Sequence, residues 1–287
     1  MSDGKERNVS VIVAEDVLIK VIKYKPAFPY KDVVLNTIIN LIFKTKKTRR
    51  VVVVFDSISP LHKTKEYPTY RRGASDKLQF KWEPIYHESR CEVLEYVYDT
   101  LIEMGFHNIF KIEGYEGKDI VAHLMNRYPF ERFHISTDDK MYYMLLDTDL
   151  FIDRFTAIYG IKRVTPNSLY YMYGIYEDDY KMIYPIAGSR EYRIQGLYNK
   201  KEDLVYDMVR DYSFTKVFKD NAVKLSYEKN FNAFHFPYKG FNAKLSLRRI
   251  RCCKYTVLDY IRKNPNVIAD KNVSAIYEYY YKGKYYD

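Results

Sequence analysis

The sequence predicts an α/β protein with a parallel central sheet and helices on both faces, followed by a helical C-terminal region. Short apolar runs alternate with helical patterns over about the first 160 residues, which is typical of a parallel sheet. One run, VVVVF at Val51–Phe55, is apolar throughout, as expected of a strand buried on both faces. After Gly160 the pattern changes to helix and loop, with Lys, Arg and Tyr interspersed.

Strands and helices are expected in alternation along the first part of the chain. Short apolar runs predict the strands Val9–Ala14, Val51–Phe55, Asn108–Ile112, Arg132–Ser136 and Leu150–Phe155. Apolar residues at helical spacing predict the helices Lys31–Phe43, Glu88–Met104, Glu116–Tyr128 and Lys140–Leu146.

The change of pattern places a boundary near residues 160–164, with an α/β domain over 1–162 and a helical region over 163–287. Thr165 is suited to cap a helix, and Pro166 suits its first position, because proline lacks the N–H that is unpaired there. This helix is expected to continue to Gly174.

Composition points to a packed protein, since the chain of 287 residues is 47% hydrophobic and 17% aromatic. Tyrosine contributes 32 residues. These side chains can pack in a core or stack on bases. An overall bias toward Tyr, Lys, Ile and Asn, as an AT-rich genome would encode, is the simpler explanation for most of them.

The net charge of +10 predicts a polyanionic partner, with nucleic acid as the first candidate and an anionic membrane surface as the second. Two basic runs stand out. One is Lys44–Arg50, and the other lies within residues 239–254 and contains Lys239, Lys244, Arg248, Arg249, Arg251 and Lys254. Such runs are either solvated surface or phosphate contacts.

The cysteines predict no disulfide partner. Cys91, Cys252 and Cys253 are odd in number and contain no CxxC spacing, so reduced thiols are expected. The polar N-terminus has no apolar signal core, and no apolar run approaches the roughly 20 residues of a membrane span. The expectation is a soluble, intracellular, cytoplasmic monomer without a membrane partner.

Acidic residues follow three of the expected strands. Asp56 ends one strand, Glu116 and Asp119 open the helix after the next, and Asp138 and Asp139 end a third. Because parallel strands place their carboxyl ends at one sheet edge, these groups can converge there. Carboxylates suit Mg²⁺ or Mn²⁺, and a pair of such ions can hydrolyse a phosphodiester. Each acid alone is also an ordinary capping residue.

Five segments over about residues 10–200 carry a family resemblance. VVVVFDSISPLHKTKEYPTYRRG resembles a strand ending in aspartate and a basic YPxYKxxR helix. GYEGKDIVAHL resembles G-x-E-A-D-D-I-I-A-x-L, and ISTDDKMYYML resembles S-G-D-x-D-x-x-Q-L. VTPNSLYYMYGI resembles V-T-P-x-x-φ-x-x-x-Y-G-I, where φ is apolar, and IAGSREYRIQGL lies where L-x-G-D-x-S-D-N-I-P-G-V is expected. Together they resemble the flap endonuclease and 5′→3′ exonuclease family of phages and of the small nuclease domain of bacterial DNA polymerase.

The resemblance implies a PIN-like nuclease fold with a C-terminal helix–three-turn–helix-like region that grips duplex DNA. It places catalytic roles on Asp56, Glu116, Asp119 and Asp138, and Arg71 falls on the catalytic lysine of the family's YK pair. The metal ligands would be Asp56, Glu116, Asp119 and Asp138, with Asp139 as a further oxygen donor.

Several family carboxylates are missing from this chain. Ala14 falls on the first-strand aspartate, Lys118 on the first of the Asp-Asp pair, and Lys140 on the second aspartate of D-x-D. Ser189 and Tyr192 replace both aspartates of G-D-x-S-D, and Ala74 replaces an arginine. Fewer carboxylates and two added ammonium groups predict Mg²⁺ or Mn²⁺ binding that is weak or absent. A shift of the alignment by one or two residues would instead let Glu15, Asp139 and Glu191 supply the oxygens.

DNA contacts are expected from three basic regions. The region after Asp56 resembles the arch over the family's active site, where phosphate contact and base stacking are combined. The expected contact residues are Lys63, Lys65, Tyr67, Tyr70, Arg72, Arg190, Arg193, Lys200, Lys201, Arg248, Arg249 and Arg251. A solvated loop after Asp56, and a buried stripe with charged edges near residue 248, are the other interpretations.

Two functions follow from these patterns. The first is a DNA-binding protein of the flap endonuclease type that acts on branched or 5′-ended DNA in replication or repair, with phosphodiester hydrolysis weakened or lost. The second is a non-enzymatic interaction protein that uses the same fold to dock on a viral replication or transcription complex. A phage or large-virus source, and hence a host cytoplasm, is expected by analogy.

Overall fold

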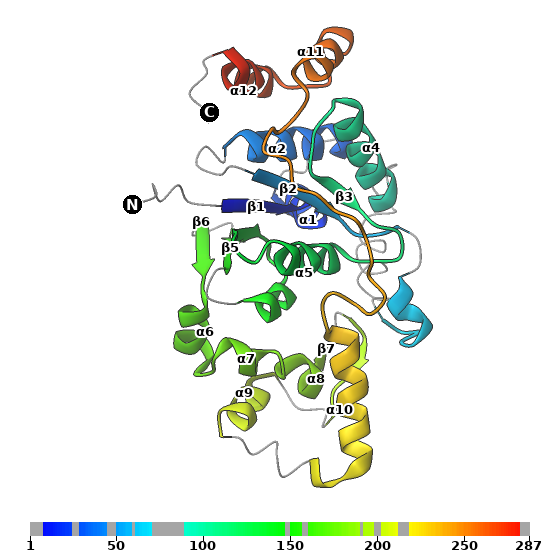
Figure 1. Cartoon of the computed structure of the whole chain (residues 1–287), viewed down its shortest axis with the longest axis vertical. Coiled ribbons are helices and arrows are strands. Elements are labelled where there is room, and N and C mark those ends of the chain that lie inside the picture. The colour runs from blue at the N-terminus through cyan, green and yellow to red at the C-terminus, as the bar shows by residue number, and fades with distance from the viewer. Residues whose placement is uncertain are drawn as a thin grey trace.

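The computed structural model describes residues 8–24, 29–44, 50–58, 61–70, 89–146, 150–156, 160–189, 192–197, 202–211 and 218–281. Its centre is a six-stranded sheet in the order β3-β2-β1-β4-β5-β6 (Figure 1). The strands are β1 (Asn8–Val13), β2 (Arg50–Phe55), β3 (Ile109–Lys111), β4 (Arg132–Ser136), β5 (Leu150–Thr156) and β6 (Gly160–Val164). Neighbours from β3 to β5 pair in parallel, and β6 runs antiparallel to β5.

Two hydrophobic cores lie on opposite faces of this sheet, and β2 contributes to both. Val51, Val53 and Phe55 pack in the core beneath α1 (Ala14–Tyr24), α2 (Tyr30–Lys44) and α4 (Arg90–Glu103). Val52 and Val54 point the other way, toward α5 (Gly117–Arg127). Figure 1 shows α2 and α4 on one side of the sheet and α5 on the other. A strand buried on both faces therefore explains the VVVVF run.

The helical part continues the core on the α5 side. It contains α6 (Pro166–Tyr173), α7 (Glu177–Tyr180), α8 (Ile183–Ala187), α9 (Glu202–Arg210) and α10 (Asn221–Phe234), with a hairpin of β7 (Gly188–Ser189) and β8 (Ile194–Gln195). Thr165 caps α6 and Gly174 ends it in the left-handed conformation, as the sequence predicts. Tyrosines fill this layer: the rings of Tyr173 and Tyr206 stack with centroids 4.4 Å apart.

The last described segment leaves this layer and crosses to the opposite end of the molecule. Residues 235–253, here called the crossing segment, connect α10 to the two final helices, α11 (Lys254–Lys263) and α12 (Asp270–Tyr281), without forming a helix or a strand (Figure 1). Asn272 on α12 donates to the backbone carbonyl of Asn36 on α2 at 2.8 Å. Residues 254–281 thus pack against the α2 side, away from α6 to α10.

The strands and helices differ from expectation in several places. Helix α1 and strand β6 are additional, and β6 spans the boundary that the sequence places at 162. Residues Lys140–Leu145 form a 3-10 helix, η2, whose first turn is capped by Asp139. Helix α4 begins at Arg90 because Ser89 and Glu92 form a capping box. Within the described ranges, no helix has the length and apolar content needed to cross a bilayer.

Asn108 binds the crossing segment to the start of β3. The Asn108 amide donates to the carbonyls of Val51 and Arg248 and accepts from the Arg248 N–H, at 3.1, 2.8 and 2.7 Å. Its backbone has φ 57°, a left-handed conformation that asparagine tolerates better than most residues. Asn108 therefore precedes β3 rather than starting it.

We expect Asn108→Ala to lower the free energy of unfolding by about 2–4 kcal/mol, because buried partners lose their hydrogen bonds and the backbone becomes strained. Asn108→Gly removes the same bonds without the strain and should lose about 1 kcal/mol less. Urea denaturation of the three proteins measures both differences. Equal stability of Asn108→Ala and the wild type would show that the Asn108 hydrogen bonds do not stabilise the fold.

Candidate functional site

Seven carboxylates lie at the carboxyl ends of four neighbouring strands, β3, β2, β1 and β4. Parallel pairing brings these strand ends to one edge of the sheet. Glu116 and Asp119 stand at the start of α5, Asp56 follows β2, and Glu15 and Asp16 open α1. Asp138 and Asp139 follow β4. The acids that follow the expected strands therefore share this edge, and Glu15 and Asp16 of α1 add two acids after β1.

Glu116 is the most deeply buried of these acids, with 0% of its surface exposed. Its Oε2 atom accepts a hydrogen bond from the Tyr70 hydroxyl at 2.8 Å and from the Lys63 ammonium at 3.1 Å. The Lys118 ammonium lies 3.5 Å from its other oxygen, Oε1. Two lysines from different elements therefore flank one carboxylate.

Asp119 shares one of these lysines. Its Oδ1 atom lies 3.4 Å from the Lys63 ammonium and accepts the backbone N–H of Tyr238 at 2.7 Å. Its Oδ2 atom accepts the N–H of Glu116 at 3.0 Å. Burial raises the pKa of Asp119, while the charge of Lys63 opposes that rise.

Lys118 connects the start of α5 to the end of β4. Its ammonium is 2.9 Å from Asp139 and donates to the Tyr192 hydroxyl at 2.8 Å. The same hydroxyl donates to Asp139 at 2.6 Å. Asp139 also accepts the N–H of Met141 at 2.8 Å, which fixes its position at the start of η2.

Asp56 and Glu15 form a second group. Asp56 accepts the N–H of Gly117 at 2.7 Å, and the Arg90 guanidinium lies 4.0 Å from its other oxygen. The N–H of Asp56 donates to Glu15 at 2.7 Å. Burial, together with the nearby charge of Asp56, raises the pKa of Glu15 to about 8, so this group holds a proton at neutral pH.

Asp138 and Asp16 form the third group, at the end of β4. Asp16 accepts from the Thr137 hydroxyl and from the Asp138 N–H, the latter at 3.2 Å. The Lys20 ammonium lies 3.3 Å from Asp138. Burial raises the pKa of Asp16 to about 6.

These residues do not fit the two-ion centre that the resemblance implies. Among the described residues, no group of three or more Asp, Glu, His or Cys side chains is arranged to hold a metal ion. Ammonium groups of Lys63 and Lys118 instead lie between the carboxylates of Glu116, Asp119 and Asp139. A divalent cation there would be repelled by two fixed positive charges.

The structure thus places the predicted ligands in three sets. Glu116, Asp119 and Asp139 share the two lysines, whereas Asp56 lies beside Arg90 and Asp138 beside Lys20. Five predicted residues lie outside the described part of the chain, namely Arg71, Arg72, Arg190, Lys200 and Lys201.

Four predicted DNA contacts need correction because their side chains are buried. Lys63 and Tyr70 bind Glu116 and are each 1% exposed, and the Tyr67 hydroxyl donates to the carbonyl of Lys229 at 2.6 Å. Arg251 donates to the carbonyl of Ile42 at 2.7 Å and lies over two aromatic rings. Buried side chains of this kind do not reach phosphate. The other described members of the set are exposed: Lys65, Arg193, Arg248 and Arg249.

Sequence reasoning missed the roles of Lys63, Arg90 and Lys20. No local pattern marks Lys63 as a buried group, because its partners come from α5, more than 50 residues further along the chain. Lys118 and Tyr192 did carry a signal, since both stand where the family resemblance places aspartates.

The free energy of unfolding should fall as pH rises from about 4.5 to about 8. Unfolding lets Glu15 release, near its usual pKa of 4.5, a proton that the folded protein keeps up to about pH 8. Its contribution is therefore present at low pH and lost as pH rises through 8. Glu15→Gln, which mimics the protonated form, should flatten this dependence in urea denaturation.

The variant Asp16→Asn serves as the control for this prediction. It should remove only the part of the pH dependence below about pH 6, because the pKa of Asp16 in the folded wild-type protein is about 6. If the free energy of unfolding of Glu15→Gln falls above pH 6 as steeply as that of the wild type, Glu15 is not buried in its protonated form.

Comparisons with known proteins identify the fold. No protein-family model and no curated protein matches the chain. A pseudo-enzyme variant of the bacteriophage T5 flap endonuclease, solved with product DNA and metal ions, aligns at 15% identity and TM-score 0.64. The alignment covers 95% of this chain and 98% of that chain.

Two other solved structures give the same result. Flap endonuclease-1 from Methanococcus jannaschii aligns at 15% identity and TM-score 0.57, covering 96% of this chain and 93% of that one. The catalytic core of Rad2 in complex with DNA aligns at 14% identity and TM-score 0.59, covering 95% and 92%. The chain therefore has the fold of the flap endonucleases and 5′-exonucleases.

Proposed function

We propose that this protein is a DNA-binding protein of the flap endonuclease type that recognises branched or 5′-ended DNA, with metal-dependent phosphodiester hydrolysis weakened or lost. The observation that carries the proposal is the pairing of Glu116, Asp119 and Asp139 with two buried lysines at the carboxyl edge of a nuclease-like sheet. The fold supports DNA processing, and the lysines argue against the family's hydrolytic step.

The lysines act against hydrolysis by electrostatics. Divalent cations in such enzymes activate water and stabilise the leaving oxygen of the phosphodiester. Two unit charges about 4 Å apart interact by about 4 kcal/mol at an effective dielectric constant of about 20. Two ammonium groups among the carboxylates therefore oppose cation binding by several kcal/mol.

One similar structure bears on DNA binding. The bacteriophage T5 flap endonuclease pseudo-enzyme, in which lysine replaces an aspartate, was solved with DNA and metal ions. One lysine at an aspartate position of that protein is thus compatible with a DNA complex, whereas this chain places two lysines among its carboxylates. In this chain Lys118 and Lys140 stand where the family resemblance places aspartates.

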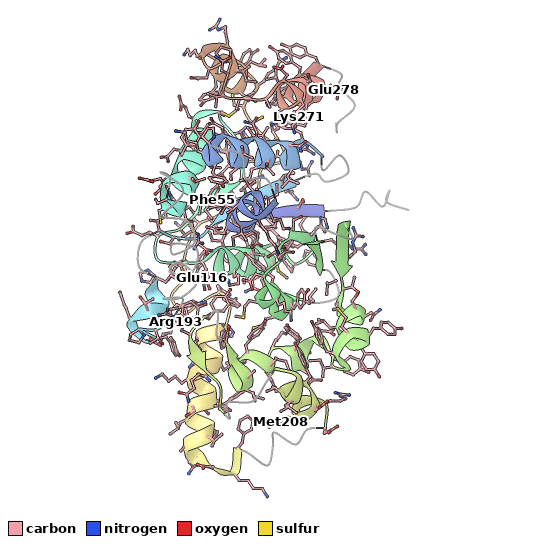
Figure 2. The ribbon with its side chains drawn as sticks, turned by 180° about the vertical axis from the view of Figure 1, so that it is seen from behind. Phe55, Glu116, Arg193, Met208, Lys271 and Glu278 are labelled. Carbon is pink, nitrogen blue, oxygen red and sulfur yellow. The ribbon has the colours of Figure 1, made fainter. Side chains whose placement is uncertain are left out.

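Exposed cations near the site supply the proposed DNA contacts. Lys65 lies beside the buried Lys63, and the Thr69 hydroxyl of the same segment donates to the carbonyl of Arg193 at 3.2 Å. In Figure 2, Phe55, Glu116 and Arg193 follow one another from the sheet toward the helical part along one side of the molecule. Arg248 and Arg249 add two exposed cations away from the site, because Arg248 bonds to Asn108, which precedes the amino end of β3.

The second candidate is a non-enzymatic interaction protein that docks on a replication or transcription complex. It is favoured by three exposed tyrosines, Tyr170, Tyr171 and Tyr176, which expose 48%, 87% and 62% of their surface. Tyr170 and Tyr176 stack on each other with centroids 5.1 Å apart. Aromatic residues grouped at a surface are typical of protein interfaces.

We expect the protein to bind a 5′-flap DNA more tightly than blunt duplex of the same length, without Mg²⁺- or Mn²⁺-dependent cleavage or with only slow cleavage. Fluorescence anisotropy measures binding, and a gel assay of labelled flap DNA measures cleavage. Rapid Mn²⁺-dependent cleavage that Asp138→Ala abolishes would contradict the loss of hydrolysis. Equal affinity for both DNAs would favour the interaction protein instead.

Arg248→Ala/Arg249→Ala should weaken DNA binding and reduce the slope of log affinity against log salt by about 0.9 for each phosphate that the two arginines neutralise in the wild type. Arg262→Ala is the matched control, because Arg262 is an exposed arginine on α11 that pairs with Asp259. An unchanged salt slope in the double variant would remove these two residues from the interface.

A further inference from the structure

Lys63 and Lys118 join parts of the chain that are far apart in sequence. Lys63 belongs to the 3-10 helix η1 (His62–Lys65), and its ammonium reaches Glu116 and Asp119 on α5. Lys118 on α5 reaches Asp139 after β4 and Tyr192 of the helical part. Both lysines are almost fully buried, at 1% and 2% exposure.

Aromatic rings enclose both ammonium groups. The Lys63 Nζ atom lies 4.1 Å from the centroid of Phe236 and 5.5 Å from that of Tyr70. The Lys118 Nζ atom lies 4.8 Å from the centroid of Tyr192. Ring faces stabilise a desolvated cation, so these positions are shaped for ammonium groups.

We propose that Lys63 and Lys118 are resident counter-ions: their ammonium groups permanently take the place of divalent cations and hold the helical part to the sheet. This role is structural and does not depend on whether the protein binds DNA. A buried carboxylate such as Glu116 needs a cation partner to offset its desolvation. Here the chain supplies that partner itself.

The wild-type protein should therefore be indifferent to divalent cations. After treatment with a chelator, addition of about 5 mM MnCl₂ should change the melting temperature by less than about 1 °C, since a ligand stabilises only a state it binds. A rise of several degrees would overturn the proposal. This measurement needs no variant and no DNA.

Lys118→Met keeps most of the length of the side chain and removes its charge. We expect the melting temperature to fall by about 10 °C, because Glu116 and Asp139 lose a buried partner. In this variant Mn²⁺ should raise the melting temperature again, because Asp139 and the Oε1 atom of Glu116 no longer face the Lys118 ammonium, while Lys63 still binds the Oε2 atom. No fall, or no rise with Mn²⁺, would contradict the proposal.

Two further variants separate charge pairing from loss of packing. Lys181→Met removes an exposed lysine that pairs with Asp178, and should shift the melting temperature by about 2 °C or less. Lys118→Met/Asp139→Asn removes both charges of one ion pair. Its fall in melting temperature should be clearly smaller than the sum of the falls for Lys118→Met and Asp139→Asn alone. Purely additive losses would contradict counter-ion pairing.

Discussion

The ion pairing around Glu116 is the constraint on which the rest of the site depends. This carboxylate has no exposed surface, yet Tyr70 and Lys63 donate hydrogen bonds to it, and the Lys118 ammonium lies 3.5 Å from its other oxygen. Burying an ionised group without such partners is far too costly for a protein of ordinary stability. The position and the charge of Lys63 and Lys118 are therefore needed to keep Glu116 buried at this edge of the sheet.

The start of α5, with Glu116, Lys118 and Asp119, connects three parts of the molecule. The segment containing Lys63 and Tyr70 is fixed to the start of α5, and α5 is fixed to the hairpin through Tyr192. The N–H of Tyr238, from the segment after α10, completes the set by binding Asp119. The fold is thus held together at this edge by ion pairs between lysines and acids. The proposed DNA contacts are exposed side chains that take no part in these pairs.

The sequence predicts the periodic parts of the fold well. Residues Val51–Phe55 and Arg132–Ser136 form strands because apolar runs between turn signals have few alternatives. The sequence does not predict strand β6, because β6 forms by pairing with β5 and its own residues give no strand pattern. The location of the acids follows from strand ends, whereas Lys63 and its partners are joined by the tertiary fold. Tyr67 and Tyr70 were placed at a surface because tyrosine suits both a core and a base stack.

The central claim is that ammonium groups, not metal ions, neutralise the acids at this edge. A crystal grown in Mn²⁺ and measured at the manganese absorption edge tests it most directly. The account predicts no anomalous peak among Glu116, Asp119 and Asp139, with the Lys118 ammonium in contact with Asp139. One or two manganese peaks there, with Lys63 and Lys118 displaced from the carboxylates, would contradict it.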